Sequence, residues 1–247
     1  MTGFDFDRVS ADDYERFRPD YSPAAVDWLV EVARLPSGSP VLDLGAGTGK
    51  LTRLLVAKGT DAVAVEPSPL MRARLAETVP IARVLEGTAE SIPLPDSSVD
   101  CVTVAQAFHH FRSDTALAEI HRVLRAGGSL ALFWTVYADG GPSKVELDRI
   151  IDRHMDPESA VWAAFEAWPK AFERTQLFSS AGRRSFPHTH ALPSEHLATV
   201  MATSSDVASL QEDRRDALLQ EIRALARRLP GDLEMPAETR VDLFVRT

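Results

Sequence analysis

The segment Val41-Leu42-Asp43-Leu44-Gly45-Ala46-Gly47-Thr48-Gly49-Lys50-Leu51-Thr52 decides the fold that this sequence of 247 residues predicts. Its first four residues form a strand pattern interrupted by one acid, and Leu51, Leu54 and Leu55 then repeat with helical spacing. The glycines between them therefore form a turn from a strand into a helix. Because glycine lacks a Cβ, its backbone can take positive φ and approach a ligand closely. The segment predicts a ligand-binding turn.

Two features of this turn bear on the charge of its ligand. A dinucleotide fingerprint has its third glycine three residues after the second, and that position is Lys50 here. Asp43 stands two residues before the first glycine, where a carboxylate facing the ligand repels a pyrophosphate and attracts a cation. S-adenosylmethionine carries an ammonium and a sulfonium and no phosphate. The pattern favours this nucleoside over NAD, and a glycine-rich turn without a ligand is the alternative.

The motif Asp43-x-Gly45-x-Gly47-x-Gly49 resembles the first motif of the class I S-adenosylmethionine-dependent methyltransferases, and the chain is similar to their small-molecule, type 11 members. The resemblance covers residues 14–134 and weakens beyond them. It implies an α/β fold with a doubly wound, Rossmann-like sheet of seven strands, the last of them antiparallel. It also implies S-adenosyl-L-methionine as cofactor and S-adenosyl-L-homocysteine as product, with Asp43, Gly45, Ala46 and Gly47 at the cofactor.

Composition limits the partners and the compartment. The net charge is −9, from 27 basic and 36 acidic side chains without a basic stripe, which disfavours nucleic acid. No apolar stretch is long enough to cross a bilayer, so no membrane contact is expected. The start lacks an apolar secretory core, and the single Cys101 cannot form an internal disulfide, which indicates the cytoplasm. We expect a small-molecule substrate and a monomer or homodimer.

Apolar periodicity gives the expected order of elements. Strands are predicted at residues 41–44, 62–65, 82–85, 101–105 and 129–134, alternating with helices at 24–34, 50–58, from 69 and at 115–124. Further helices are predicted at 145–154, 158–172, 194–201 and 217–229, with strands near 183–186 and at 239–245. We interpret residues 1–247 as one domain: an N-terminal lid (1–23), a cofactor-binding core (24–135), and substrate-facing helices with the last strands (136–247).

The resemblance also assigns roles outside the glycine turn. The stretch Tyr14-Glu-Arg-Phe-Arg18-Pro-Asp-Tyr21 is similar to a lid that folds over the cofactor. It implies that Tyr14 and Arg18 approach the methionine carboxylate and that Tyr21 lines the acceptor side. The alternative is that these aromatic residues only attach the first helix to the body.

Cofactor contacts are also expected at three further strand ends. Glu66 follows the second strand, 17 residues past Gly49, where a carboxylate can accept both ribose hydroxyls, and Pro67 lies beside it. The resemblance places the Ala89 backbone at an adenine ring nitrogen and leaves the exocyclic amine to Thr88 or Glu90. Gln106 and Ala107, at the end of the fourth strand, complete the predicted set of cofactor residues.

The chemistry predicted is an in-line displacement in which orientation supplies most of the rate. If a general base is needed, His109 is the first candidate, because imidazole titrates near neutral pH and the resemblance places this strand end at the transferring methyl group. His110 is its rival, and the alternative is that both cap a helix or fill the core. His188, His190 and His196 lack an acid or Cys that completes a metal-ligand set, so no metal is predicted.

Aromatic residues indicate the nature of the acceptor. Phe108 and Trp134 follow the cofactor residues, and Trp162 and Trp168 come from the helical region where similar proteins place their substrate walls. We therefore predict an aromatic or apolar acceptor pocket, with ordinary helix core as the alternative. The predicted function is methyl transfer from S-adenosylmethionine to a small aromatic or apolar metabolite. An NAD-dependent oxidoreductase and a non-catalytic S-adenosylmethionine-binding module are the alternatives.

Overall fold

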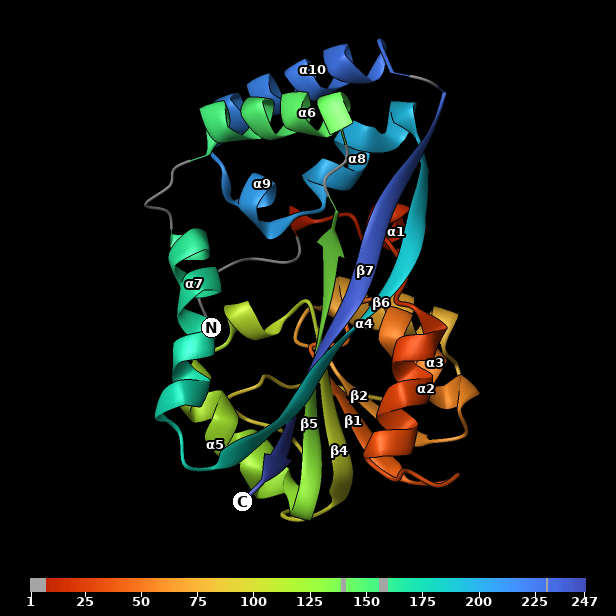
Figure 1. Ribbon diagram of the computed structural model, residues 1–247, viewed down its shortest axis with the longest axis vertical. Helices are drawn as coiled ribbons and strands as arrows, with labels where there is room; N and C mark the ends of the chain where they lie inside the picture. Colours follow the sequence, from red (N-terminus) through yellow and green to blue (C-terminus); the bar gives the residue numbers. More distant parts are fainter. Residues whose placement is uncertain (1–7, 139–140, 156–159, 230) are drawn as a thin grey trace.

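The computed structural model describes residues 8–138, 141–155, 160–229 and 231–247, without the side chains of 141–142 and 160–166. Within these residues seven strands form one sheet of order β3-β2-β1-β4-β5-β7-β6 (Figure 1). The strands are β1 (Pro40–Leu44), β2 (Asp61–Val65), β3 (Arg83–Leu85), β4 (Val99–Ala105), β5 (Leu124–Tyr137), β6 (Phe178–Pro193) and β7 (Asp232–Arg246). Strands β1 to β5 pair in parallel, and β7 is antiparallel to both β5 and β6. The predicted sheet with its antiparallel last strand is confirmed.

Helices cover both faces of the sheet. The helices of the sheet region are α2 (Pro23–Val32), α3 (Lys50–Ala57), α4 (Pro69–Thr78), α5 (Ser113–Val123) and α7 (Ala160–Arg174). Figure 1 shows α2 and α3 on one face and α5 and α7 on the other. Leu29, Leu51 and Leu55 pack with Cys101 and Phe133 in one buried cluster beneath α2 and α3. Of the predicted apolar residues of α3, Leu51 and Leu55 are therefore buried and Leu54 is partly buried, whereas Leu70 of α4 is 51% exposed. Cys101 is a core residue.

Local sequence explains where these helices begin. Pro23 stands at the first position of α2 and Pro69 at the first position of α4, where the missing N–H has no helical partner in any case. The Ser68 hydroxyl accepts the Met71 N–H at the start of α4. The Ser-Pro pairs at residues 22–23 and 68–69 thus mark both helix starts.

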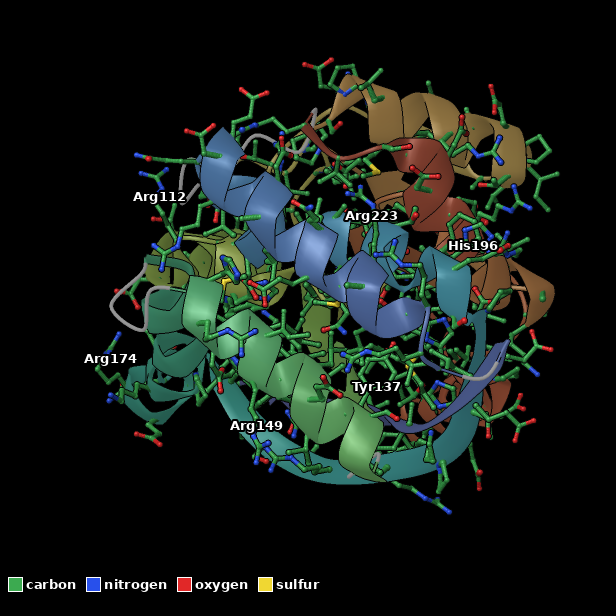
Figure 2. All side chains as sticks on the ribbon, turned by 90° about the horizontal axis from the view of Figure 1, so that it is seen from above. Arg112, Tyr137, Arg149, Arg174, His196 and Arg223 are labelled. Atoms are coloured by element: carbon green, nitrogen blue, oxygen red, sulfur yellow. The ribbon has the colours of Figure 1, made fainter. Side chains whose placement is uncertain are left out.

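A helical cap lies beyond the carboxyl ends of the parallel strands. Strands β6 and β7 pair from Phe178 opposite Arg246 as far as Pro193 opposite Asp232, and they leave the sheet as a two-stranded ribbon. Their far end carries η3 (Ser194–His196), α8 (Leu197–Ala202), α9 (Ser205–Ser209) and α10 (Glu212–Ala226). Figure 2 shows α10 beside α6 (Gly141–His154) on top of the molecule. The cap has a buried apolar cluster of its own.

The lid contains a helix that the sequence analysis did not predict. Helix α1 (Ala11–Phe17) begins at Ser10, whose hydroxyl accepts the Asp13 N–H, and it contacts α8 of the cap. The lid predicted at residues 1–23 is described only from residue 8 onward. Among the described helices, none combines the length and apolar character needed to traverse a bilayer.

Candidate functional site

Two connected cavities open at the carboxyl ends of the parallel strands. The first, which we call the strand-end cleft, has a volume of about 70 Å³ and lies against the ends of β1, β2 and β4. The second, which we call the cap cavity, has a volume of about 270 Å³ and lies between the strand ends, the lid and the α8–α9 segment. Both are lined by Tyr14, Gly45, Gly47, Ala105, Gln106 and His110. A ligand that follows these shared residues passes from one cavity into the other.

Backbone hydrogen bonds hold the glycine turn against the end of β2. The N–H groups of Gly45 and Ala46 donate to the Val65 carbonyl at 2.8 and 3.2 Å, and the Gly47 N–H donates to Glu66 Oε2 at 2.9 Å. Gly45 has φ of +69°, and a Cβ there would lie 2.9 Å from the Ala107 Cβ. Gly47 has φ of +57°, and a Cβ there would meet no protein atom within 4 Å. The turn therefore presents bare backbone to open space, as close binding of a nucleoside requires.

Glu66 lies at the strand-end cleft with a fixed orientation. Its side chain is buried, with Oε2 bound to Gly47 as above and Oε1 accepting the Ser68 N–H at 2.9 Å. Burial raises the pKa of this carboxyl, while the two N–H groups act against the rise. Each carboxylate oxygen has a second lone pair, so Glu66 can still accept hydroxyl donors from a ligand in the cleft.

Asp43 does not face either cavity. Its fully buried carboxylate accepts the hydroxyl of Thr52 on α3 at 2.6 Å and that of Thr103 on β4 at 2.9 Å. Burial raises the pKa of Asp43 to about 6, against the lowering effect of the two threonines. The prediction that this carboxylate faces a cationic ligand is therefore wrong. Strand alternation points the side chain toward α3, where it joins β1, β4 and α3.

The other predicted nucleoside residues meet at the strand-end cleft. Pro67, Thr88, Ala89, Glu90 and Ala107 all line it. Thr88 and Ser91 form an isolated bridge through paired backbone hydrogen bonds, which places Ala89 and Glu90 at a tight turn. Glu90 Oε1 accepts the Arg112 N–H at 2.9 Å. The geometry brings both Thr88 and Glu90 to the cleft and leaves both as candidates for an exocyclic amine.

The lid is fastened to the cap and to the outer strands. Tyr14, Arg18 and Tyr21 line the cap cavity, as predicted for residues that close over a ligand. Arg18 Nε donates to Thr203 Oγ1 at 2.8 Å, and its guanidinium lies 5.6 Å from the centre of the Tyr14 ring. These contacts come from residues far apart in the sequence, so closure of the lid depends on the cap.

Gln106 lies where β4 ends, in a strained conformation. It has φ of +52°, which is uncommon for a residue other than glycine. Its backbone N–H donates to the Phe133 carbonyl at 2.9 Å, and the residue lines both cavities. Strain held by the neighbouring strands is a frequent feature of functional sites. The sequence placed Gln106 at the site but gave no signal for this strain.

The comparisons with known proteins agree with this geometry. Residues 42–132 match a family described as a methyltransferase domain. A methyltransferase-like protein of Schizosaccharomyces pombe, uncharacterized, is 33% identical over 221 residues, which cover 88% of this chain and 84% of the relative. The chain belongs to the class I methyltransferases. An uncharacterized methyltransferase of Mycobacterium tuberculosis is 50% identical over 144 residues, and the match covers only 58% of each chain.

A solved methyltransferase shares the fold of this family member. The phosphoethanolamine N-methyltransferase 2 of Haemonchus contortus was solved with phosphomonomethylethanolamine and S-adenosylhomocysteine. The likeness has a TM-score of 0.54 at 16% identity and covers 98% of this chain and 59% of that one. At this identity the likeness concerns the fold alone.

The two candidate histidines of this methyltransferase line the cap cavity, but their pKa values differ from expectation. His109 and His110 lie on the short helix η2 (Phe108–His110), with ring centres 3.9 Å apart. Burial lowers the pKa of His109 to about 3, with a smaller contribution from His110, and burial lowers the pKa of His110 to about 4. The expectation that they titrate near neutral pH is wrong. Both are neutral at pH 7 and are weak bases.

The predicted aromatic acceptor walls belong to the core. Phe108 is fully buried, with ring centres 5.5 Å from Phe111 and 5.3 Å from Phe172. Trp134 stacks on Trp168 at 5.0 Å, and both are buried between the sheet and α7. None of the three predicted residues lines either cavity. Their assignment to the acceptor is therefore wrong, and the alternative of helix core holds; the side chain of Trp162 lies outside the described residues.

The cap wall of the cavity was missed from the sequence. It consists of Thr203, Ser204, Ser205 and Asp206, with Thr135 and Lys50 opposite. A short polar run between two helices is typical of any surface turn, so nothing local distinguished it. Only the β6–β7 ribbon, which carries this segment over the strand ends, makes it part of the site. The described residues contain no group of three or more His, Cys, Asp or Glu placed to hold a metal ion.

Proposed function

We propose that this protein transfers the methyl group of S-adenosylmethionine to a small, polar metabolite. The observation that carries the proposal is the contact between the Gly47 N–H and Glu66, which joins a glycine turn to a carboxylate across one cleft. A bare turn beside a buried hydroxyl acceptor suits a nucleoside. The choice of cofactor is supported by the Haemonchus contortus methyltransferase, which has a similar fold and was solved with S-adenosylhomocysteine.

The residues present fit this cofactor from end to end. Glu66 would hold the ribose hydroxyls, and the Ala89 backbone with Thr88 or Glu90 would hold adenine in the strand-end cleft. Tyr14 and Arg18 would hold the methionine carboxylate in the cap cavity. Gln106 and His110, which line both cavities, lie between the two ends.

When bound, the sulfonium supplies an activated methyl group that needs no further activation by the protein. The contribution of this chain is then orientation of the acceptor and exclusion of water. Neutral imidazoles at His109 and His110 can donate or accept a hydrogen bond to position the acceptor. Their low pKa values make them inefficient general bases near neutral pH, so we propose positioning as their role.

The lining of the cap cavity supports a polar acceptor. The hydroxyl-bearing residues Thr135, Thr203, Ser204 and Ser205 line it. Hydroxyls at a small cavity favour a ligand that can hydrogen-bond, because unpaired buried polar groups are costly. We propose a cytoplasmic small-molecule enzyme, and the acidic net charge of −9 supports this over nucleic acid as substrate.

Label transfer tests the proposal directly. The purified protein is incubated with methyl-labelled S-adenosylmethionine and separated small-molecule, RNA and protein fractions of a cell extract. We expect label in polar compounds of the small-molecule fraction, together with formation of S-adenosylhomocysteine. The variant Glu66→Gln should reduce both without unfolding the protein. Absence of label from every fraction, or label in RNA or protein alone, contradicts the proposal.

A further inference from the structure

Two opposite charges line the cap cavity without forming an ion pair with each other. They are the side chains of Arg18 and Asp206. Within the described part of the chain, neither side chain forms an ion pair at or below 4.0 Å, although ion pairs are frequent elsewhere in the molecule. The other cation of the wall, Lys50, is already paired with Asp20 at 2.8 Å.

The cap and the lid bring these two charges to one segment. Arg18 Nε donates to Thr203 Oγ1 at 2.8 Å, and Asp206 follows three residues later in the same segment. Thr203 in turn donates to the Val200 carbonyl at 2.6 Å, which attaches this contact to α8. The Arg18 side chain is therefore held at the segment that carries Asp206.

Each charge can gain from a partner of opposite sign. Burial raises the pKa of Asp206, while the nearby Arg18 and a hydrogen bond from Ser205 act in the opposite direction. A carboxylate in this position gains from an ammonium that enters the cavity, and a guanidinium gains from a carboxylate. An α-amino acid carries both groups on one carbon atom, so its charges complement this pair.

We propose that Asp206 binds the ammonium of the cofactor's amino-acid head group while Arg18 binds its carboxylate. This inference rests on the proposed function and assigns Asp206, a residue of the cap, to cofactor binding. The glycine turn and Glu66 then hold the nucleoside half from the sheet, and the cap holds the amino-acid half. One ligand thereby joins the two parts of the molecule.

Ligands with and without the head group test this assignment by calorimetric titration. S-adenosylhomocysteine has the complete amino acid, whereas 5′-methylthioadenosine has the same nucleoside without it. We expect Asp206→Asn to weaken S-adenosylhomocysteine by about 10- to 100-fold, the range for loss of a charge-assisted contact, and to leave 5′-methylthioadenosine unchanged. The control Asp216→Asn, exposed on α10, should change neither affinity. Equal melting temperatures verify that the near-isosteric variants fold.

A third ligand distinguishes the contact to the ammonium from the contact to the carboxylate. S-adenosyl-3-thiopropylamine has the amine and lacks the carboxylate, so its affinity should still fall in Asp206→Asn and should not fall in Arg18→Gln. If Asp206→Asn binds S-adenosylhomocysteine as tightly as the wild type, Asp206 serves the acceptor and the inference is overturned. Equal weakening of 5′-methylthioadenosine overturns it in favour of a structural role. If the wild type binds none of the three ligands, the proposed function itself fails.

Discussion

The two walls of the cap cavity are built in different ways. The sheet wall consists of backbone and side chains at the ends of adjacent parallel strands, whose register is fixed by pairing such as Asp43 with Ala64 and Thr103. The cap wall consists of residues 203–206, held over the strand ends by a two-stranded ribbon and by side-chain contacts to the lid. The sheet wall depends on local backbone geometry, whereas the cap wall depends on contacts between distant segments.

This difference indicates which wall binds the shared part of the ligand and which wall binds the part that differs between family members. Parallel strands bring their carboxyl ends to one edge in any doubly wound sheet, so the sheet wall suits the part of the ligand that all members of the family share. Among the described residues, the apolar cluster of the cap includes none from β1 to β5, so the cap wall can change its residues without disturbing the parallel strands. We therefore propose that the sheet holds the nucleoside and that the cap holds the head group and the acceptor.

Glycine substitutions should have the largest effects and test the sheet wall. In Gly45→Ala the new Cβ lies 2.9 Å from the Ala107 Cβ at positive φ, so we expect unfolding to become easier by about 3 kcal/mol. Gly47→Ala also has positive φ but meets no protein atom, so it should cost about 1 kcal/mol and still weaken S-adenosylhomocysteine at least tenfold. Gly38→Ala, with φ of +83° and open space, is the control that keeps its affinity. Denaturant unfolding measures the stability of each variant, and calorimetry measures its affinity for S-adenosylhomocysteine. Equal affinities in all three variants would refute the proposal that the sheet wall binds the nucleoside.

The buried acid of the sheet wall should reveal itself in the pH dependence of stability. The pKa of Asp43 is about 6 in the folded protein and near 3.8 when exposed, so the unfolded chain ionises first as pH rises. The contribution of Asp43 to stability should therefore decline between about pH 4 and pH 6, by about 3 kcal/mol in total. It is measured as the difference in free energy of unfolding between the wild type and Asp43→Asn, which share the contributions of all other groups. Urea unfolding of both proteins at a series of pH values tests it, and a difference that stays constant over this interval would contradict the burial of Asp43.

Removing a contact that holds the lid tests whether the cap wall can be destabilised without the sheet wall. His190 Nε2 donates to the Phe17 carbonyl at 2.9 Å, and the Tyr137 hydroxyl donates to Nδ1 at 2.8 Å. His190→Leu leaves both partners unpaired, so we expect a loss of about 1 to 3 kcal/mol and faster hydrogen exchange in α1. Exchange in β1 and β4 should not change, and Thr189→Val, at an exposed position of β6, is the control. Uniformly faster exchange in the sheet would show that the two walls are not independent.

The smallest change between pH 5.5 and pH 8 is expected in the titration of the histidine pair. Because burial lowers the pKa of His109 to about 3 and of His110 to about 4, neither imidazole should titrate between pH 5.5 and pH 8. The unfolded chain takes up protons near pH 6.5, so the pair contributes stability above that pH, which is lost as the pH falls toward 4. Nuclear magnetic resonance measures the titration of each imidazole, with the signals assigned from the variants His109→Gln and His110→Gln. A midpoint near 6.5 would restore His109 as a general base.

The sequence predicted the sheet wall because its signals are local. Glycine spacing, the acid after the second strand and apolar periodicity each reflect a few neighbouring residues, and Glu66 and Gln106 lie where the pattern put them. Burial was not predictable in this way. Asp43 lies in the interior because α3 folds back against β1, and Trp134 because α7 packs on it from a distant part of the chain.

The cap was only partly predictable. The strand expected near residues 183–186 extends over Phe178–Pro193, because exposed polar residues pair through their backbone with β7 and show no apolar alternation. The helix expected at 194–201 divides into η3 and α8, and the segment that follows carries Asp206. Its role depends on the ribbon and on Arg18, so no short stretch of sequence contains the information.

Calorimetric titration of the wild-type protein with S-adenosylhomocysteine and with NAD tests the central claim most directly. That claim is that the turn at Gly45 and Gly47, joined to Glu66, binds the nucleoside of S-adenosylmethionine. We predict one molecule of S-adenosylhomocysteine bound per chain and no binding of NAD. Retention of NAD with no uptake of S-adenosylhomocysteine would contradict the account.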